Sequence, residues 1–430
     1  MNIALYGNTL ESYVAATSLC SFGHTIKLFT ADSNLTADDS RFIESEPGLR
    51  KLIEKNKERG VLIIKGEISP IDAELHWVFF KGDSFQKLES LLFGICENNS
   101  SVNLILSTSL GIGSYKVIKQ KFSDGFDNFN LATIPPFIRE GRATKDFESP
   151  ELLLIGAEST QLISKISTAL STIIEAANKV MFVSGTEAEF IKTSICTFLA
   201  TRLSLINEIS GLAEDLEIDI NTVIDGVGAD SRIGYEYLQP GCGFGGVTLS
   251  QEVHNLLDVL SNSSTGSAML KAVFETNVKQ KEALFRKFWQ YNNANISGLK
   301  VAIWGASFKP NSSSIINSPI HELIDVLTAQ GCEIYIYDPA ALDSLLKDYG
   351  ELENVHFYDT KMEAARSSDA LFIITAWKEF FEPDFFKLKQ LMRCPVIFDG
   401  RNIYEPGEVE AFGFEYFGIG RGKVIKRDGN

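Results

Sequence analysis

The segment NIALYGNTLESYVAATSLCSFGHTIKLF, residues 2–29, specifies the fold of the first part of the chain. Its apolar pattern predicts a strand over Asn2–Tyr6, a turn at Gly7 and a helix over Leu10–Phe22. A second strand is predicted over Thr25–Phe29, after a glycine that ends the helix. A strand, a helix and a second strand in this order are the repeating unit of a doubly wound α/β sheet.

The same alternation continues to about residue 185. Strands are predicted at four further places: Val61–Ile64, Trp77–Phe80, Asn103–Leu106 and Leu152–Ile155. Strands that alternate with helical stretches indicate a parallel sheet with helices on both faces. We therefore expect a doubly wound parallel-sheet domain over residues 1–185.

The middle of the chain, residues 186–297, is predicted to be a helical domain. Residues 188–216 contain no proline, and their apolar side chains recur at spacings of three, four or seven residues. A helix with this much apolar surface usually packs against other helices or a second subunit. A glycine-rich loop follows at Gln239–Gly246. A second helical region is predicted from about Glu252 to Tyr291, and Ser261–Ser267 interrupts it.

The last part of the chain, residues 298–430, repeats the α/β pattern. A strand is predicted over Lys300–Trp304, followed by a helix with Ser318 as its N-cap and Pro319 at its first position. A strand over Glu333–Tyr337 completes a second βαβ unit. The sequence thus predicts two doubly wound parallel-sheet domains joined by a central all-helical domain.

Composition limits the classes of function. The 430 residues are 44% hydrophobic, which is enough for full-sized cores, and their formal net charge is −16. An acidic chain is unsuited to nucleic acid or to anionic lipid, so neither is expected as a partner. An anionic metabolite would have to be bound by a few placed cations and backbone N–H groups.

The six cysteines are far apart in sequence and form no Cys-x-x-Cys pair, so neither a disulfide framework nor a metal site is predicted. No apolar stretch approaches the roughly 20 residues that span a bilayer. We expect a cytoplasmic protein with no membrane association, in which Arg421–Asn430 is a solvated end.

Nine segments, in order along the chain, resemble the UDP-glucose/GDP-mannose dehydrogenase family, the nucleotide-sugar 6-dehydrogenases. They are EPGL (Glu46–Leu49), Ser107 with Thr108 and Gly111, PFIREGRATKD (Pro136–Asp146), LATRLSLINEISGLAED (Leu199–Asp215), GVGADSRIG (Gly226–Gly234), LQPGCGFGG (Leu238–Gly246), WGASFKPNS (Trp304–Ser312), DGRNIY (Asp399–Tyr404) and GFEYFGIGR (Gly413–Arg421). The resemblance implies two Rossmann-like domains joined by a helical dimerisation domain. It also implies oxidation of a sugar C6 alcohol to a carboxylate, with two NAD reduced through a cysteine thioester.

The family's nucleophilic cysteine lies two residues beyond a Gly-Gly pair, and this chain has Thr248 there. A thiolate suits the reaction because it is nucleophilic and a fair leaving group. A threonine hydroxyl has a far higher pKa and needs an adjacent strong base. Two carboxylates of the family have counterparts in this chain. Glu252, after the glycine-rich loop, matches the general base, and Glu140, in the PFIREGRATKD segment, matches the second glutamate of the family's corresponding run.

Lys192 matches the family lysine that stabilises developing alkoxide charge. Cys196 stands where the family has an asparagine, and the i, i+4 spacing places Lys192 and Cys196 on one helical face. Two interpretations stay open. Either Cys196 has taken over the nucleophile's role, with Lys192 lowering its pKa, or it is a small buried apolar residue.

The resemblance implies NAD as cofactor, with Gly7, Thr108 and Glu140 as the retained cofactor-binding residues. A dinucleotide turn uses three glycines, whereas Gly7-Asn8-Thr9-Leu10-Glu11-Ser12 keeps only the first. Glu11 brings a negative charge close to where the diphosphate would lie.

Two other positions depart from the same pattern. Thr30 stands where an acidic residue would grip the ribose, and Gly82-Asp83 places a carboxylate near the expected cofactor. The sequence therefore predicts a folded N-terminal scaffold that has lost its dinucleotide.

The substrate side of the family pattern is better kept. The matching residues are Phe137, Ile138, Glu140, Arg232, Gly241, Gly243, Phe244, Gly245, Phe308, Lys309 and Arg401. Fixed cations and exposed glycine N–H groups are what an anionic diphosphate needs in an acidic protein. The alternative interpretation is that these residues are inherited for the fold alone.

Three hypotheses follow. In the first, the chain binds a nucleotide sugar, most simply a UDP-sugar, and acts in polysaccharide biosynthesis as a binding or assembly protein without four-electron oxidation. In the second, it is a divergent NAD-dependent UDP-sugar dehydrogenase that uses Lys192 with Cys196 or Thr248. In the third, it is a scaffold that binds neither ligand. The expected partner is a second copy or an active paralogue.

Overall fold

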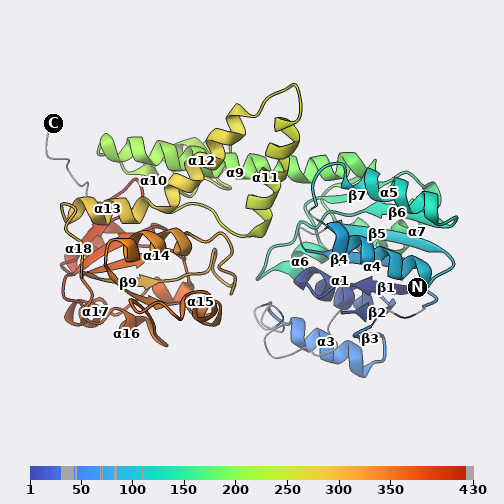
Figure 1. Ribbon diagram of the computed structural model, residues 1–430, viewed down its shortest axis with the longest axis horizontal. Helices are drawn as coiled ribbons and strands as arrows, with labels where there is room; N and C mark the ends of the chain where they lie inside the picture. Colours follow the sequence, from blue (N-terminus) through green and yellow to red (C-terminus); the bar gives the residue numbers. More distant parts are fainter. Residues whose placement is uncertain are drawn as a thin grey trace. The chain divides into compact units, whose positions relative to one another are not determined.

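The computed structural model describes residues 1–30, 43, 46–67, 69, 71–81, 85–108 and 110–422 (Figure 1). The chain forms two compact units, unit 1 at Met1–Ile195 and unit 2 at Cys196–Asn430. The Gly82-Asp83 pair and the tail after Gly422 lie outside the described residues. The division into three domains stays a prediction.

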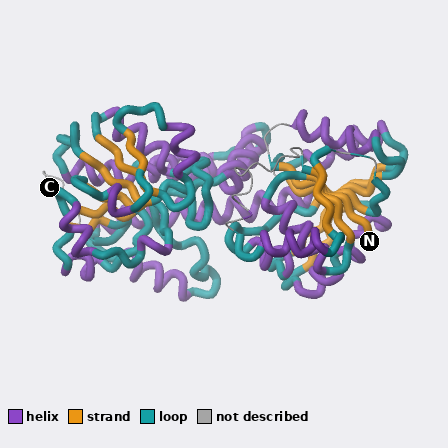
Figure 2. The backbone as a smooth tube through the Cα atoms, turned by 90° about the horizontal axis from the view of Figure 1, so that it is seen from below, coloured by secondary structure: helices purple, strands orange, loops and turns teal. Residues whose placement is uncertain are grey.

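Unit 1 is built on an eight-stranded sheet with the order β3-β2-β1-β4-β5-β6-β7-β8. Figure 2 shows its strands as a twisted fan among helices. The strands are β1 (Asn2–Tyr6), β2 (Thr25–Phe29), β3 (Leu62–Lys65), β4 (Leu75–Phe80), β5 (Val102–Thr108), β6 (Phe129–Thr133), β7 (Leu153–Ala157) and β8 (Val180–Val183).

Alternation along the strands supplies a core on each face of this sheet. In β1, Ile3 and Leu5 belong to one cluster of buried side chains, and Ala4 and Tyr6 belong to another. Successive side chains of a strand point to opposite faces, so one strand serves both cores. The helices of unit 1 are α1 (Leu10–Ser21), α3 (Leu49–Glu58), α4 (Phe85–Glu97), α5 (Ser114–Gly125), α6 (Ala143–Glu148), α7 (Thr160–Ala169) and α8 (Ser171–Ala176).

The prediction of a parallel sheet is wrong at one pair of strands. Strands β6 and β7 are antiparallel, with Ala132 opposite Ala157 and Thr133 opposite Gly156. Neither β6 nor β8 was predicted. A pattern of apolar residues predicts that a segment is a strand. It does not predict the direction of that strand in the sheet, which depends on the path of the preceding connection.

Helices dominate the segment between the two sheets. They are α9 (Gly185–Asp215), which contributes to both units, α10 (Ile220–Ala229), α11 (Val247–Ser261), α12 (Ala268–Lys281) and α13 (Ala283–Tyr291). The predicted long helix and the interruption after Ser261 are confirmed. Helix α11 begins five residues earlier than predicted, directly after Gly246, and α10 was not predicted.

Unit 2 contains a six-stranded, fully parallel sheet with the order β11-β10-β9-β12-β13-β14. Its strands are β9 (Lys300–Trp304), β10 (Glu333–Tyr337), β11 (Val355–Phe357), β12 (Ala370–Ile373), β13 (Val396–Asp399) and β14 (Glu415–Phe417). Strands β9 and β10 have the predicted bounds. The predicted fold class, two doubly wound sheets with a helical centre, is confirmed.

The helices around this sheet are α14 (Pro319–Ala329), α15 (Leu342–Tyr349), α16 (Lys361–Ala364), α17 (Phe385–Leu391) and α18 (Pro406–Ala411). Helix α14 begins as predicted, because the Ser318 side chain accepts the Ile320 N–H and Pro319 needs no partner. Among the described residues, no helix is long and apolar enough to cross a membrane.

Candidate functional site

The sheet of unit 1 reverses its strand order between β1 and β4, which is where doubly wound sheets bind ligands. Gly7 follows β1 at this point with φ +142°, and a Cβ there would lie 2.4 Å from the Phe79 carbonyl oxygen. Only glycine fits so close a contact. Thr108 ends β5 at the same carboxyl edge, so the sheet brings these two predicted cofactor residues to one edge.

The N-terminus of α1 is satisfied by its own side chains. The Ser12 N–H donates to Thr9 Oγ1 at 3.2 Å, and the Thr9 N–H donates to Ser12 Oγ at 3.1 Å. This reciprocal capping box occupies groups that a dinucleotide turn presents to its diphosphate.

Glu11 adds a buried negative charge to the same turn. Its side chain is 11% exposed, and its Oε1 lies 2.6 Å from Lys81 Nζ. The positive charge of Lys81 is therefore paired with Glu11 of the same chain. The nearby Thr30 is buried, and its hydroxyl donates to the Lys65 carbonyl rather than offering an acid to a ribose. A capped helix end with a carboxylate does not fit a dinucleotide diphosphate.

The loop after β6 carries Phe137, Ile138 and Glu140. Glu46, from the EPGL segment, accepts the Gly141 N–H at 2.8 Å and so fixes the backbone at the end of this loop. Asp146 also binds the loop, because it accepts the backbone N–H and the guanidinium of Arg139.

Lys192 approaches the same loop from α9 and is 7% exposed. Its Nζ donates to the Pro136 carbonyl oxygen at 2.7 Å and lies 4.5 Å from the centroid of the Phe137 ring. The structure therefore brings Lys192 and the Phe137–Glu140 segment together.

The predicted nucleophiles are differently placed. Thr248 lies in the first turn of α11 with an exposed side chain, and Glu252 is buried one turn later. Cys196 is 4% exposed within α9. Cys242 is fully buried, and burial raises the pKa of its thiol, so this side chain is held in its unreactive, protonated form.

The glycine-rich loop Gln239–Gly246 is held by amide side chains of α9 and α12. Asn207 Oδ1 accepts the Gly241 N–H at 2.8 Å, and Gln280 Nε2 donates to the Gly241 carbonyl at 2.8 Å. Asn277 pairs with both the N–H and the carbonyl of Phe244. These three amides fix the loop backbone in one conformation.

Glycine is required where this loop meets the loop after β9. A Cβ on Gly245 would lie 2.4 Å from the Asn317 carbonyl oxygen, and one on Gly246 would lie 2.6 Å from the Phe308 ring. Lys309 follows, with its Nζ 5.5 Å from the centroid of that ring. The predicted residues Gly245, Phe308 and Lys309 are therefore neighbours.

Arg401 reaches the glycine-rich loop from the carboxyl end of β13. Its Nε donates to the Ile374 carbonyl at 2.7 Å and one terminal nitrogen donates to the Gly243 carbonyl at 3.3 Å. The other terminal nitrogen is buried and has no hydrogen-bond partner among the described residues. The guanidinium is thus aligned by carbonyl groups while its positive charge is not neutralised by a described carboxylate.

Arg232 does not join this group. Its side chain is 87% exposed, and its guanidinium binds Asp230 at 2.6 Å on the turn after α10. That turn is held by Arg202, which donates to the Ile233 and Gly234 carbonyls.

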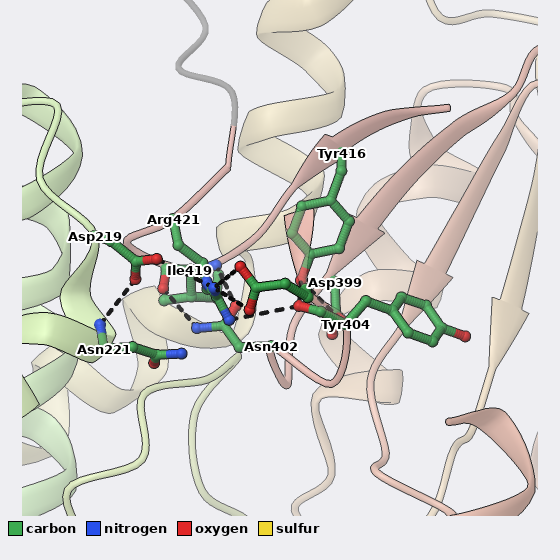
Figure 3. Close-up of polar contacts among 9 residues, drawn as sticks. Asp219, Asn221, Asp399, Asn402, Tyr404, Tyr416, Ile419 and Arg421 are labelled. Atoms are coloured by element: carbon green, nitrogen blue, oxygen red, sulfur yellow. Dashed lines mark hydrogen bonds and ion pairs between the residues drawn. The ribbon is translucent and has the colours of Figure 1, made fainter. Parts of the chain in front are cut away.

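A second feature of unit 2 is a cavity of about 400 Å³ beside Glu214, Glu217, Asp219 and Arg421. Arg421 and Asp219 are drawn in Figure 3, and the Arg421 guanidinium binds Asp219 at 3.1 Å. The same guanidinium binds Glu405 at 3.0 Å. The prediction that Arg421 begins a solvated end is wrong, because these carboxylates hold its side chain at 5% exposure. A cavity lined by three carboxylates repels a diphosphate.

Several residues that shape these loops were missed by sequence reasoning. Glu46 and Asn207 lie in segments that carry the family resemblance, so a signal existed for them. Asn277 and Gln280 lie on α12 in a sequence without any recognisable motif. Their role depends on which loop α12 packs against.

Residues 302–406 match the family model described as "UDP-glucose/GDP-mannose dehydrogenase family, UDP binding domain". Residues 186–279 match the model described as the central domain of the same family.

Individual relatives agree with these matches. The UDP-glucose 6-dehydrogenase of Pseudomonas aeruginosa is 34% identical over 68% of this chain, an alignment that spans 65% of the relative. UDP-glucose 6-dehydrogenase TuaD of Bacillus subtilis is 30% identical over 98% of this chain and 94% of its own length. The solved UDP-glucose dehydrogenase of Pyrobaculum islandicum has the same fold, with a TM-score of 0.83, 21% identity and 97% coverage of both chains.

Proposed function

The chain belongs to the UDP-glucose/GDP-mannose dehydrogenase family, and from this premise we propose that it binds a nucleotide sugar without oxidising it. The ligand is a UDP-sugar, held by the loops of unit 2. The protein then serves in polysaccharide biosynthesis as a binding or assembly component.

The observation that carries the proposal is the state of Arg401. Its guanidinium is aligned by the Ile374 and Gly243 carbonyls, and one buried nitrogen lacks a described partner. Burying an unsatisfied charged donor is unfavourable unless a ligand completes it. A diphosphate oxygen is a suitable acceptor, because it forms a charge-assisted hydrogen bond with a guanidinium.

The glycine-rich loop supports the same ligand. Its conformation is held by Asn207, Asn277 and Gln280 before any ligand arrives, so little ordering entropy remains to be lost on binding. Phe308 packs against its last glycines and Lys309 adds a cation. In an acidic protein, these groups form a local site for an anion.

The loss of oxidation is supported by the chemistry at three positions. Thr248 offers a hydroxyl in place of a thiol at an exposed helical position. Cys242 is protonated and buried, and Cys196 is buried within α9. A thioester route needs a thiolate that substrate can reach.

The loss of the dinucleotide is supported by the α1 turn. The Thr9–Ser12 capping box satisfies the helix end, and the Glu11–Lys81 ion pair brings a carboxylate to the expected diphosphate position. A dinucleotide would have to displace the capping interactions and approach a like charge.

One observation favours the alternative of a divergent NAD-dependent enzyme. Lys192 is buried and directed at the loop that carries Glu140, as a residue retained for catalysis would be. In this alternative, Lys192 acts with Cys196 or Thr248. Lys192→Ala would then abolish turnover, and so would the alanine variant of whichever residue, Cys196 or Thr248, is the nucleophile.

We also propose that α9 pairs with α9 of a second copy or of an active paralogue. Phe198, Leu205 and Leu212 recur every seven residues and are 73%, 55% and 58% exposed. A row of apolar side chains at this spacing is the pattern of a helix that packs against another helix.

The deciding experiment titrates the protein by calorimetry with UDP-glucose and, separately, with NAD. The expected result is heat with the nucleotide sugar and none with NAD. Absorbance at the NADH band is then followed with both ligands present. Sustained NADH production would contradict the proposal, and binding of neither ligand would leave only the scaffold hypothesis.

A further inference from the structure

We infer that Asp338 is the positioning residue that holds the Phe308–Lys309 loop in its ligand-binding conformation, an inference that rests on the proposed function. Asp338 follows β10, the second strand of the βαβ unit in unit 2, and is 1% exposed. In a dinucleotide-binding unit, an acid near this place binds a ribose. Here the acid is turned inward instead.

Both carboxylate oxygens of Asp338 are saturated by the protein. Oδ2 accepts the Ala306 N–H at 2.7 Å, the Ser307 N–H at 3.0 Å and the Ser307 hydroxyl at 3.1 Å. It also accepts the Trp377 indole N–H at 3.1 Å. Oδ1 accepts the N–H groups of two further residues, Ala340 and Ala341, each at 2.8 Å.

The carbonyls of the same two loop residues are also bound. Ser318 Oγ donates to the Ala306 carbonyl at 2.6 Å, and Thr375 Oγ1 donates to the Ser307 carbonyl at 2.6 Å. All four backbone polar groups of Ala306 and Ser307 therefore have partners. Such a segment has little freedom left, and Phe308 is the next residue.

The position of Phe308 matters because its ring packs where Gly246 has no side chain, 2.6 Å from the place a Cβ would occupy. A shift of the 306–307 backbone would move this ring and with it the glycine-rich loop. Charge-assisted hydrogen bonds are stronger than neutral ones, so a buried carboxylate fixes the two amides better than an amide side chain would. Asp338 thus acts on the ligand through the loop.

The test compares Asp338→Asn with Asp369→Asn. Asp369 is a second buried carboxylate of unit 2 and directly precedes β12. It accepts the N–H of Lys300, the first residue of β9, so it lies at the amino edge of the sheet, opposite to the loops at the carboxyl edge. In Asp338→Asn, either orientation of the amide turns an N–H₂ group towards donors, and the charge is lost. Both variants lose a buried carboxylate, and Asp369→Asn also loses the ion pair with Arg393, so both melting temperatures are expected to fall.

The readout is the Kd for UDP-glucose measured by calorimetry. Asp338→Asn is expected to raise the Kd at least ~10-fold, equivalent to ~1.4 kcal/mol. Asp369→Asn is expected to leave it unchanged. Equal Kd values for Asp338→Asn and the unaltered protein, or an equal rise in both variants, would overturn the inference.

Hydrogen exchange separates this inference from the proposed function. In Asp338→Asn, the amides of residues 305–309 are expected to exchange faster, and in Asp369→Asn they are expected to keep their rate. If the unaltered protein does not bind UDP-glucose, the proposed function fails, whereas the exchange result still decides whether Asp338 holds the loop. Unaltered exchange in Asp338→Asn would refute it.

If Asp338→Asn does not fold, Ser307→Ala provides a milder change. It removes the hydroxyl that donates to Asp338 and accepts the Trp377 indole N–H at 3.1 Å. A rise in Kd of ~3-fold and a shift in Trp377 emission, identified by difference from Trp377→Phe, are expected because the indole loses a polar neighbour. If Ser307→Ala alters neither the Kd nor the Trp377 emission, the inferred role of Asp338 is contradicted.

Discussion

Replacing Arg401 by lysine tests the proposed site most directly. The substitution keeps the positive charge but removes the planar fork that binds two carbonyls and presents a third nitrogen. A lysine ammonium can keep the Ile374 contact or reach the ligand, and it cannot do both in the same geometry. The interaction lost is one charge-assisted hydrogen bond, ~1.5–3 kcal/mol.

That loss corresponds to a Kd for UDP-glucose raised ~10- to 100-fold. Isothermal titration calorimetry measures it, and a thermal melt checks that Arg401→Lys remains folded. Arg232→Ala is the matched control, because Arg232 is 87% exposed and bound to Asp230. The reasoning is refuted if Arg401→Lys binds as tightly as the unaltered protein, or if Arg232→Ala weakens binding equally.

Three further predictions concern the cofactor turn, acid stability and assembly. The triple variant Glu11→Val, Thr9→Gly and Ser12→Gly should bind ADP-ribose measurably by calorimetry, since the three changes remove a like charge and the capping box. Burial lowers the pKa of His76 to about 4, so the unfolded chain, with the ordinary value of 6.5, takes up the proton first as pH falls. Stability should therefore drop between pH 6.5 and 4, by up to ~3 kcal/mol, and urea unfolding of His76→Asn should show a smaller drop. Leu205→Glu should convert a dimer to monomer in analytical ultracentrifugation, because it places a charge in the exposed apolar row of α9, and an unchanged mass would argue against that interface.

Much of the fold is readable from local patterns. The bounds of β1, β2, β9 and β10 agree with prediction, because alternating apolar residues and adjacent glycines specify a buried strand and its end. The start of α14 at Ser318 and Pro319 is equally local, since a cap needs only its own helix.

The candidate site is only half readable in this way. The residues that we propose to face the ligand, such as Phe308 and Arg401, carry the family resemblance and were named from the sequence. The residues that hold them were not, because Asn277, Asp338 and the loops they bind are far apart in sequence.

Amino-acid order alone predicted two α/β sheets around a helical centre and the family resemblance, because both depend on short-range patterns of polarity and glycine. Tertiary structure alone decided that Glu11 binds Lys81, that β7 runs antiparallel to β6 and that Thr248 lies in the first turn of a helix. Those outcomes depend on which distant groups can reach one another once the core has formed. The polarity pattern of a short segment does not specify its contacts with residues far away in the sequence.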